Sequence, residues 1–191
     1  MNYLAHLLLA QPTDDSRLGA IIGDFMSGQA VAEFTPGIQE GILRHRRIDE
    51  ITDAHPVFRR SRGRVRESVG RFAGVVVDVV YDHFLARDWD RWSVTPLREF
   101  ADETYALLER RFDESPPRLQ RAVPYIVGGD WLMAYSRLPH LEQVFAGMSR
   151  RVKRRNPLGE AFDAVRGRYD ELSRDFDEFF PELRAKVGAE H

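Results

Sequence analysis

Three ionisable side chains interrupt strongly apolar stretches of this sequence. Asp24 follows two isoleucines and a glycine, Asp78 divides a run of valines, and His6 stands directly before three leucines. A buried carboxylate without a partner costs several kcal/mol and instead takes up a proton. The sequence therefore predicts a compensating group beside these side chains: an arginine, a hydrogen-bond network or a metal ion.

Two pairs of ionisable residues share the spacing of one helical turn. His45 and Asp49 are four residues apart, as are Asp78 and Asp82, so each pair projects from one face of a helix. If these two helix faces met beside Asp24 and His6, the side chains would form a cage of the kind that holds divalent metals between helices. The spacing alone is common on surface helices, but the place of Asp78 inside a valine run favours the cage.

Each of these residues also has an ordinary structural explanation. His6 is compatible with a hydrogen-bonded core histidine, and Asp24 with an N-cap or turn residue after a glycine. His45 begins a trio with two arginines that would suit a solvated surface, and Asp49 is placed to pair with Arg46. The sequence leaves these alternatives open.

The composition limits the nucleophiles and the metal ligands that the protein can use. The chain has 191 residues, of which 43% are hydrophobic and 30% charged, as is typical of one globular domain over residues 1–191. The absence of cysteine excludes thiol nucleophiles, so any metal must be held by His, Asp and Glu, a donor set that favours Mn²⁺, Mg²⁺ or Zn²⁺. No apolar run approaches the ~20 residues of a transmembrane helix, and no basic residue precedes Arg17 to mark a secretory signal. We therefore expect a cytoplasmic protein.

Apolar periodicity predicts an all-α, single-domain helical bundle. Helices are expected over a segment opened by Pro36, over Arg98–Asp113 and Leu141–Val152, and from Asn156-Pro157 through Phe176. Val75–Tyr81 is rich in β-branched valines and would by itself suit a buried strand. Because no neighbouring segment offers a strand partner, we predict a buried helix there.

Several common functional motifs are absent, and the arginines are clustered. The sequence has no Gly-x-Ser-x-Gly elbow, P-loop or Gly-x-Gly-x-x-Gly. The net charge is −2, yet nine arginines lie within Arg44–Arg71 and five basic residues within Arg150–Arg155. Arginine presents a rigid fork suited to carboxylate and phosphate groups, and a solvated helix face is the ordinary alternative. Nucleic acid is disfavoured because no stacking aromatic residues interleave the arginines.

Taken in order, the motifs resemble the acyl carrier protein phosphodiesterase family over nearly the whole chain. The matching segments are Met1-Asn2-Tyr3-Leu4-Ala5-His6, Gly23-Asp24-Phe25, His45-Arg46-Arg47-Ile48-Asp49 with Thr52-Asp53, Asp82-His83-Phe84-Leu85 with Trp89, Ser115-Pro116-Pro117-Arg118, Trp131-Leu132 and Gly147-Met148-Ser149-Arg150-Arg151. Tyr3, where the family often has Phe, is a minor departure.

The resemblance implies a hydrolase that removes the 4′-phosphopantetheine arm from holo-acyl carrier protein and leaves the apo form. It also implies an all-helical, HD-phosphohydrolase-like fold, divergent from the His-Asp (HD) enzymes, with Mn²⁺ as the cofactor and Mg²⁺ as the second choice. This chain lacks the adjacent His-Asp dipeptide of ordinary HD proteins and has Asp82-His83 in the reverse order. The alternatives are an HD-like enzyme acting on a nucleotide or other small phosphoester, and a non-catalytic module that binds carrier protein.

The resemblance also suggests a role for each candidate residue. The predicted metal ligands are Asp24, His45, Asp78 and Asp82, with His6 as a further ligand and Asp49 as an additional ligand or positioning group. The predicted catalytic acids are Asp24, Asp49 and Asp82, of which Asp49 or Asp82 would take a proton from water. The predicted substrate-binding residues are Arg46, Arg47 and His83, with the arginines offsetting charge on the phosphoryl oxygens. The residues predicted to bind the acidic carrier protein are Arg59, Arg60, Arg62, Arg64 and Arg66, joined by the arginines of Arg150–Arg155.

Overall fold

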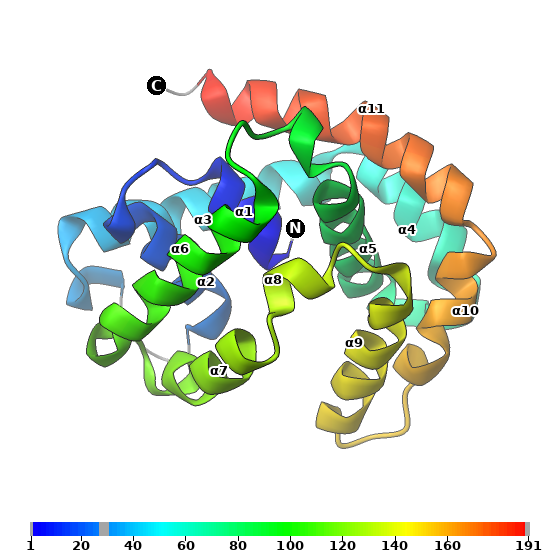
Figure 1. Cartoon of the computed structure of the whole chain (residues 1–191). Helices are drawn as coiled ribbons and strands as arrows, with labels where there is room; N and C mark the ends of the chain where they lie inside the picture. The colour runs from blue at the N-terminus through cyan, green and yellow to red at the C-terminus, as the bar shows by residue number, and fades with distance from the viewer. Residues whose placement is uncertain (1, 27–30, 190–191) are drawn as a thin grey trace.

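Helices make up all the regular secondary structure in the described residues, 2–26 and 31–189, of the computed structural model (Figure 1). The expected all-α class is therefore confirmed. The α-helices are α1 (Tyr3–Leu9), α2 (Asp14–Phe25), α3 (Pro36–Ala54), α4 (Pro56–Val69), α5 (Ala73–Arg87), α6 (Leu97–Arg110), α7 (Pro117–Gly128), α8 (Trp131–Ala134), α9 (Leu138–Arg151), α10 (Ala161–Arg166) and α11 (Tyr169–Gly188). Short 3-10 turns lie at Val31–Glu33, Gly70–Phe72, Trp89–Arg91, Phe112–Glu114 and Pro157–Glu160. Met1 of the opening motif lies outside the described residues.

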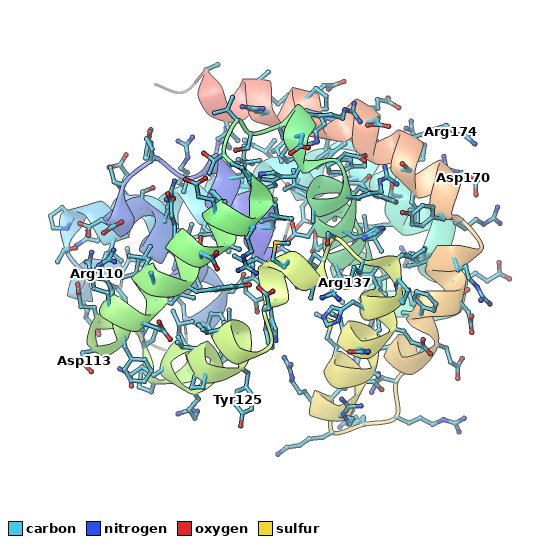
Figure 2. All side chains as sticks on the ribbon, in the orientation of Figure 1. Arg110, Asp113, Tyr125, Arg137, Asp170 and Arg174 are labelled. Atoms are coloured by element: carbon cyan, nitrogen blue, oxygen red, sulfur yellow. The ribbon has the colours of Figure 1, made fainter. Side chains whose placement is uncertain are left out.

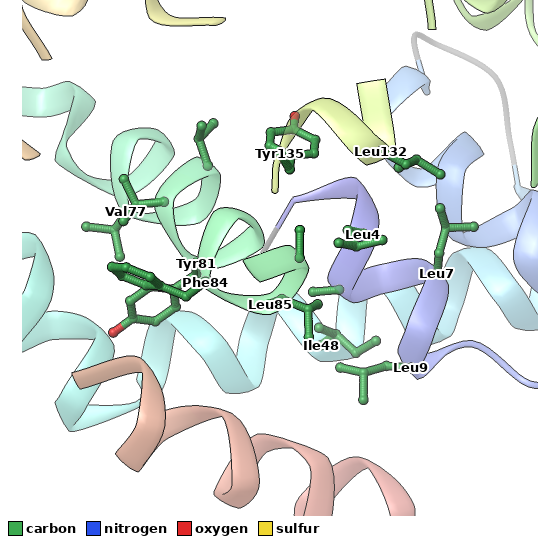
Figure 3. Packing of buried hydrophobic residues seen from close by; sticks show 14 of the residues in the cluster. Leu4, Leu7, Leu9, Ile48, Val77, Tyr81, Phe84, Leu85, Leu132 and Tyr135 are labelled. Carbon is green, nitrogen blue, oxygen red and sulfur yellow. The ribbon is translucent and has the colours of Figure 1, made fainter. Parts of the chain in front are cut away.

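The valine-rich segment forms the central helix, as predicted, and not a strand. α5 is buried along most of its length, and α1, α4, α9 and α11 pack around it (Figure 1). Its apolar side chains belong to the same core as those of α1 and α3, as Figure 3 shows for Leu85, Leu4 and Ile48. A helix that is apolar on nearly all sides is stable only when it is enclosed in this way.

The segment from Asn156 to Phe176 is not the single helix that the periodicity predicted. The Asn156 side chain does act as a cap, because its Oδ1 accepts the N–H of Leu158 at 3.1 Å. The capped turn is a 3-10 turn, however, and α10 then ends at Gly167, where the chain turns before α11. Glycine disfavours helix continuation, and Arg168 takes a non-helical φ of −126°. The apolar periodicity of the sequence therefore continues from α10 into α11, although the chain bends between the two helices.

α11 is joined to α4 by a buried acid. Asp175 of α11 is 2% exposed, and its carboxylate accepts hydrogen bonds from Arg60, Arg64 and Ser61 of α4 at 2.7–3.1 Å. Two guanidinium groups and a hydroxyl compensate the buried charge, and they hold the pKa of Asp175 below its usual range although burial alone would raise it. This network fixes the C-terminal helix across the bundle.

α2 and α3 approach each other closely because glycines face one another at their crossing. A Cβ atom at Gly19 would lie 2.4 Å from the carbonyl oxygen of Ile38 and 2.8 Å from the Cα of Gly41. Side chains at this crossing would push the helices apart. The close approach matters because α2 and α3 both contribute residues to the candidate site.

None of the helices within residues 2–26 and 31–189 combines the length and the apolar composition needed to cross a bilayer.

We predict that Gly19→Ala lowers the free energy of unfolding by ~1–3 kcal/mol, because its new methyl group overlaps the backbone of α3. For a chain of this size each kcal/mol shifts Tm by ~2–4 °C, which thermal unfolding followed by circular dichroism would measure. Gly63→Ala is the matched control. Nothing lies within 4 Å of a Cβ atom there, so the same change in α4 is expected to raise stability slightly. Equal Tm values for the two variants would contradict the close-packing explanation.

Candidate metal centre

The position of His6 depends on a carboxylate at the start of its helix. Asp82 of α5 is 0% exposed, and its two oxygens accept the N–H groups of Leu4 at 2.7 Å and Ala5 at 3.1 Å. These N–H groups belong to the first turn of α1, where helices leave donors without partners and the helix dipole favours negative charge. Burial raises the pKa of Asp82 to about 7 despite these hydrogen bonds. Asp82 therefore anchors α1, and through α1 it places His6.

The orientation of His45 follows from the packing of α3 against α2. Its Nδ1 lies 2.8 Å from the carbonyl oxygen of Ala20, which can only accept, so Nδ1 carries the proton and donates it. A Cβ atom at Gly23 would lie 2.5 Å from the His45 ring, so only glycine at this position allows the approach. The remaining nitrogen, Nε2, is thereby turned toward Asp49, 3.2 Å from its Oδ2.

His6, His45 and Asp49 form one cluster of potential ligands. The Nε2 atom of His6 lies 3.2 Å from the second oxygen of Asp49, and the two imidazole rings stack with centroids 3.8 Å apart. One ligand atom from each residue falls within 4.8 Å of the other two. Both rings are almost completely buried, whereas the Asp49 side chain is 43% exposed, so the cluster opens to solvent on the carboxylate side.

Asp24 of α2 lies at the edge of this cluster. Its Oδ1 is 3.8 Å from His45 Nε2, and its side chain is 35% exposed. Removal from water and the nearby charge of Asp49 raise the pKa of Asp24 to about 6, although the approach of His45 opposes this. This carboxyl therefore changes its charge close to neutral pH.

The two stacked imidazoles have opposite pKa shifts. Burial lowers the pKa of His6 to about 3, so this ring is neutral. Burial also acts against a charge on His45, but the hydrogen bond to Asp49 and the charge of Asp24 outweigh it and raise the pKa of His45. The hydrogen bonds from both rings hold the pKa of Asp49 well below its usual range, although burial opposes the charge there too. The cluster is thus a neutral imidazole, an imidazole that holds its proton, and a permanently ionised carboxylate.

This donor set fits a divalent metal ion. Two imidazole nitrogens and one carboxylate oxygen converge, with a second carboxylate beside them, and the Ala20 carbonyl fixes one ring by the outer hydrogen bond that metal-binding histidines usually make. Imidazole ligands suit Zn²⁺ and Fe²⁺, whereas carboxylate and water oxygens suit Mn²⁺ and Mg²⁺, and Mg²⁺ usually keeps several of its waters. Among the described residues, the cluster contains His6 and His45 from the predicted ligand set, and Asp49, which was predicted as a catalytic acid and as an additional ligand or positioning group.

The other predicted acids, both on α5, are outside the group of three convergent ligands among the described residues. Asp78 is one turn before Asp82, and burial raises its pKa. Neither carboxylate belongs to the group of three ligands. The i,i+4 spacing did place both acids on the buried helix, but it held no information about the backbone N–H groups of α1 that Asp82 meets.

The predicted substrate-binding residues are one buried histidine and two exposed arginines. His83 is buried, with Nδ1 2.7 Å from the carbonyl oxygen of Tyr135 and Nε2 2.7 Å from the hydroxyl of Tyr169. Arg46 and Arg47 are exposed on α3, and Arg47 lies 3.4 Å from Glu50. The alternative pairing of Asp49 with Arg46 is replaced by the two histidines.

The five α4 arginines do not share one surface. Arg60 and Arg64 bind Asp175 of α11, as described above. Arg59, Arg62 and Arg66 line a surface cavity of about 520 Å³ together with Arg71. Within that group, Arg59 donates to the carbonyl oxygen of Asp53 and Arg62 lies 3.4 Å from the Asp53 carboxylate.

Two features of the site were not predicted from the sequence. Gly23 has no role in the predicted site, although a glycine directly before a candidate ligand is a signal for close approach by another group. Tyr3 enters the prediction only as a departure from the family, although it is three residues before His6 and so shares a helix face with that histidine. Tyr3 lies at the junction of the site with a groove described below.

We predict that in the metal-free protein the His6 ring stays neutral between pH 5 and 8, while His45 gains its proton at a pH above the ordinary histidine value of ~6.5. A second charge 3.8 Å from the first would be repelled, so only one of the stacked rings is protonated. Ring Cε1–Hε1 shifts in NMR spectra would report both titrations, with signals assigned from His6→Gln and His45→Gln. The urea-unfolded chain is the control, and parallel titration of both rings near 6.5 in the folded protein would contradict the prediction.

Comparison with known proteins agrees with the sequence motifs. The family described as acyl carrier protein phosphodiesterase matches residues 1–183. A protein of Serratia proteamaculans (strain 568) named acyl carrier protein phosphodiesterase is 37% identical over 184 residues, covering 96% of this chain and 95% of the relative. A protein of the same name from Salmonella newport (strain SL254) is 35% identical over 188 residues, covering 98% and 97%. No solved structure matches this chain. This chain belongs to the acyl carrier protein phosphodiesterase family.

Proposed function

We propose that this protein hydrolyses the phosphodiester that links 4′-phosphopantetheine to a serine of holo-acyl carrier protein. Water adds OH to phosphorus, the bond from phosphorus to the serine oxygen breaks, and a proton ends on that oxygen, giving apo-carrier protein and free 4′-phosphopantetheine. The observation that carries the proposal is the convergence of His6, His45 and Asp49, beside Asp24, in a member of this family. The lack of cysteine supports a reducing, cytoplasmic setting.

A divalent metal, Mn²⁺ in our proposal, would be held by His6, His45 and Asp49. Such an ion supplies positive charge to the phosphoryl oxygens and lowers the pKa of water. Mn²⁺ is chosen because the family resemblance implies it, and a site with two imidazoles is a poor match for Mg²⁺, which prefers carboxylate and water oxygens. An HD-phosphohydrolase-like architecture is supported by the same feature: histidine and aspartate donors from separate helices of an all-α bundle meet at one point.

Each acid near the cluster suits a different task. Asp24 is the best general base, because its pKa of about 6 lies near neutral pH and its side chain is partly exposed beside the cluster. Asp49 is a weak base, since both histidines stabilise its charge, and it suits ligation. Asp82 is a positioning residue, because both its oxygens bind α1. Arg46, exposed on α3 directly after His45, would bind phosphate oxygens in this proposal.

We predict that Asp49→Asn abolishes high-affinity Mn²⁺ binding, whereas Asp24→Asn keeps the ion and lowers kcat by ~10²–10⁴-fold, the usual contribution of a general base. Calorimetric titration with Mn²⁺ would measure the first effect, and mass spectrometry of holo-carrier protein the second. Glu50→Gln, the exposed neighbour of Asp49 on α3, is the matched control and should change neither. Because the base must be ionised, the rate should fall as the pH drops below about 6. Full activity of Asp49→Asn without metal would refute the proposal.

A further inference from the structure

Two adjoining cavities form a groove beside the candidate metal centre. The inner cavity, of about 290 Å³, lies along α8 and α9, and the outer cavity, of about 690 Å³, lies along α7. Trp131 and Arg151 line both cavities, so the two adjoin at these side chains. Figure 1 shows α7 and α9 on opposite sides of α8, which joins them. The volumes match small-molecule sites, which occupy ~300–1,000 Å³.

The inner cavity has an apolar wall with a few polar groups. Its apolar and aromatic lining includes Tyr3, Trp131, Val144 and Met148, while His140 and Gln143 supply polar atoms. A chain of methylene groups with amides at intervals needs this combination of surfaces. The 4′-phosphopantetheine arm has that chemistry: two amides, a hydroxyl and methyl groups along a flexible chain.

Tyr3 connects the inner cavity to the candidate metal centre. Its ring lines the cavity and stacks on Phe25 with centroids 6.0 Å apart. Phe25 directly follows Asp24, and His6 is one turn along α1 from Tyr3. Burial, with a smaller contribution from the charge of Asp24, raises the pKa of Tyr3, so this phenol stays neutral beside the site. A phosphate at the cluster therefore lies near one end of the groove.

The groove is lined by arginines and by no carboxylate of the described residues. Arg118 and Arg121 come from α7, and Arg150 and Arg151 from α9. None of the four takes part in an ion pair with a described residue, in contrast to Arg60 and Arg64 of α4. Only Arg151 has a defined contact, with its guanidinium 5.8 Å from the ring centroid of Trp131. Figure 2 shows Tyr125, 70% exposed, projecting from the same helix as Arg118.

We propose that this groove is the binding site for holo-carrier protein, with the pantetheine arm in the inner cavity and the acidic surface of the carrier against the four arginines. The inference rests on the proposed function, since it takes its partner from there. The α4 cavity is the competing surface, but Asp53 already contacts two of its arginines, and its lining of Arg59, Arg62, Gly63, Arg66, Gly70, Arg71 and Ala73 offers no aromatic surface for the arm.

Charge reversal tests the arginines. The triple variant Arg118→Glu, Arg121→Glu and Arg150→Glu, made on the Asp24→Asn background to prevent turnover, should raise Kd for both holo- and apo-carrier protein at least ~10-fold at low salt. Reversal of Arg110, Arg166 and Arg174, which lie on other helices, is the matched control and should change Kd less than ~2-fold. Calorimetry or biolayer interferometry would measure the constants. Unchanged binding by the groove variant, with binding lost instead on reversal of Arg59, Arg62 and Arg66, would overturn the proposal.

A substitution that fills the inner cavity tests whether the pantetheine arm binds there. A Cβ atom at Gly147 would meet only the Arg150 guanidinium, at 3.8 Å, so Gly147→Leu fits on α9 and projects bulk toward the space for the arm. We expect Gly147→Leu to weaken holo-carrier binding to the level of apo-carrier binding and to leave apo-carrier binding unchanged. Gly188→Leu, with no neighbour within 4 Å, is the control. If Gly147→Leu weakened the binding of holo- and apo-carrier protein equally, or weakened neither, the arm would not enter this cavity.

The two proposals fail in different ways. If the wild-type protein binds holo-carrier protein through the groove but releases no phosphopantetheine with Mn²⁺, the proposed phosphodiesterase activity is wrong and the proposed docking surface is supported. If the wild-type protein releases the arm, and the groove variants on the wild-type background do so with unchanged kcat and KM, the groove is wrong and the activity stands.

Discussion

The contact between the Asp82 carboxylate and the first turn of α1 is the interaction on which the candidate site depends. α1 has seven residues, too few for a helix that is stable alone. It is held by the core contacts of Leu4 and Leu7 and by a buried carboxylate at its N-terminus. The helix in turn supplies the N–H groups without which the charge of Asp82 would be costly to bury. Each half of the contact stabilises the other, and together they place His6 over His45.

A second constraint acts from the opposite side. The glycines at the crossing of α2 and α3 bring the backbone of α2 within hydrogen-bonding distance of His45. The Ala20 carbonyl then decides which nitrogen of the ring carries the proton. Backbone geometry on both sides, rather than the ligands themselves, therefore sets where the three donor atoms converge. This explains why two nearly buried histidines can lie face to face: only one of them needs to be charged.

The sequence allowed prediction of those parts of the molecule that depend on local patterns. The buried helix through Val75–Tyr81 followed from the lack of strand partners, and the pairing of His45 with Asp49 followed from their spacing on α3. The remaining contacts depend on segments that lie far apart in the chain. Asp82 meets α1 across 77 and 78 residues, and Asp175 meets Arg64 across 111 residues. Periodicity identifies the face that is buried but not the group on the other side, so these two carboxylates became anchors of the fold.

The distribution of charge shows why net charge says little about the partner. The chain carries −2 overall, yet acids of α11 pair with Arg60 and Arg64, two of the five α4 arginines predicted to bind the carrier protein. An arginine cluster that lies beside an acidic helix forms ion pairs with it, and those pairs belong to the fold. A cluster becomes a surface for an acidic partner only where the fold places no carboxylate opposite it, as along α7 and α9. Electrostatic attraction of a carrier protein to a slightly acidic enzyme is therefore consistent with this fold, because Arg60 and Arg64 are paired within it while the arginines of α7 and α9 are exposed.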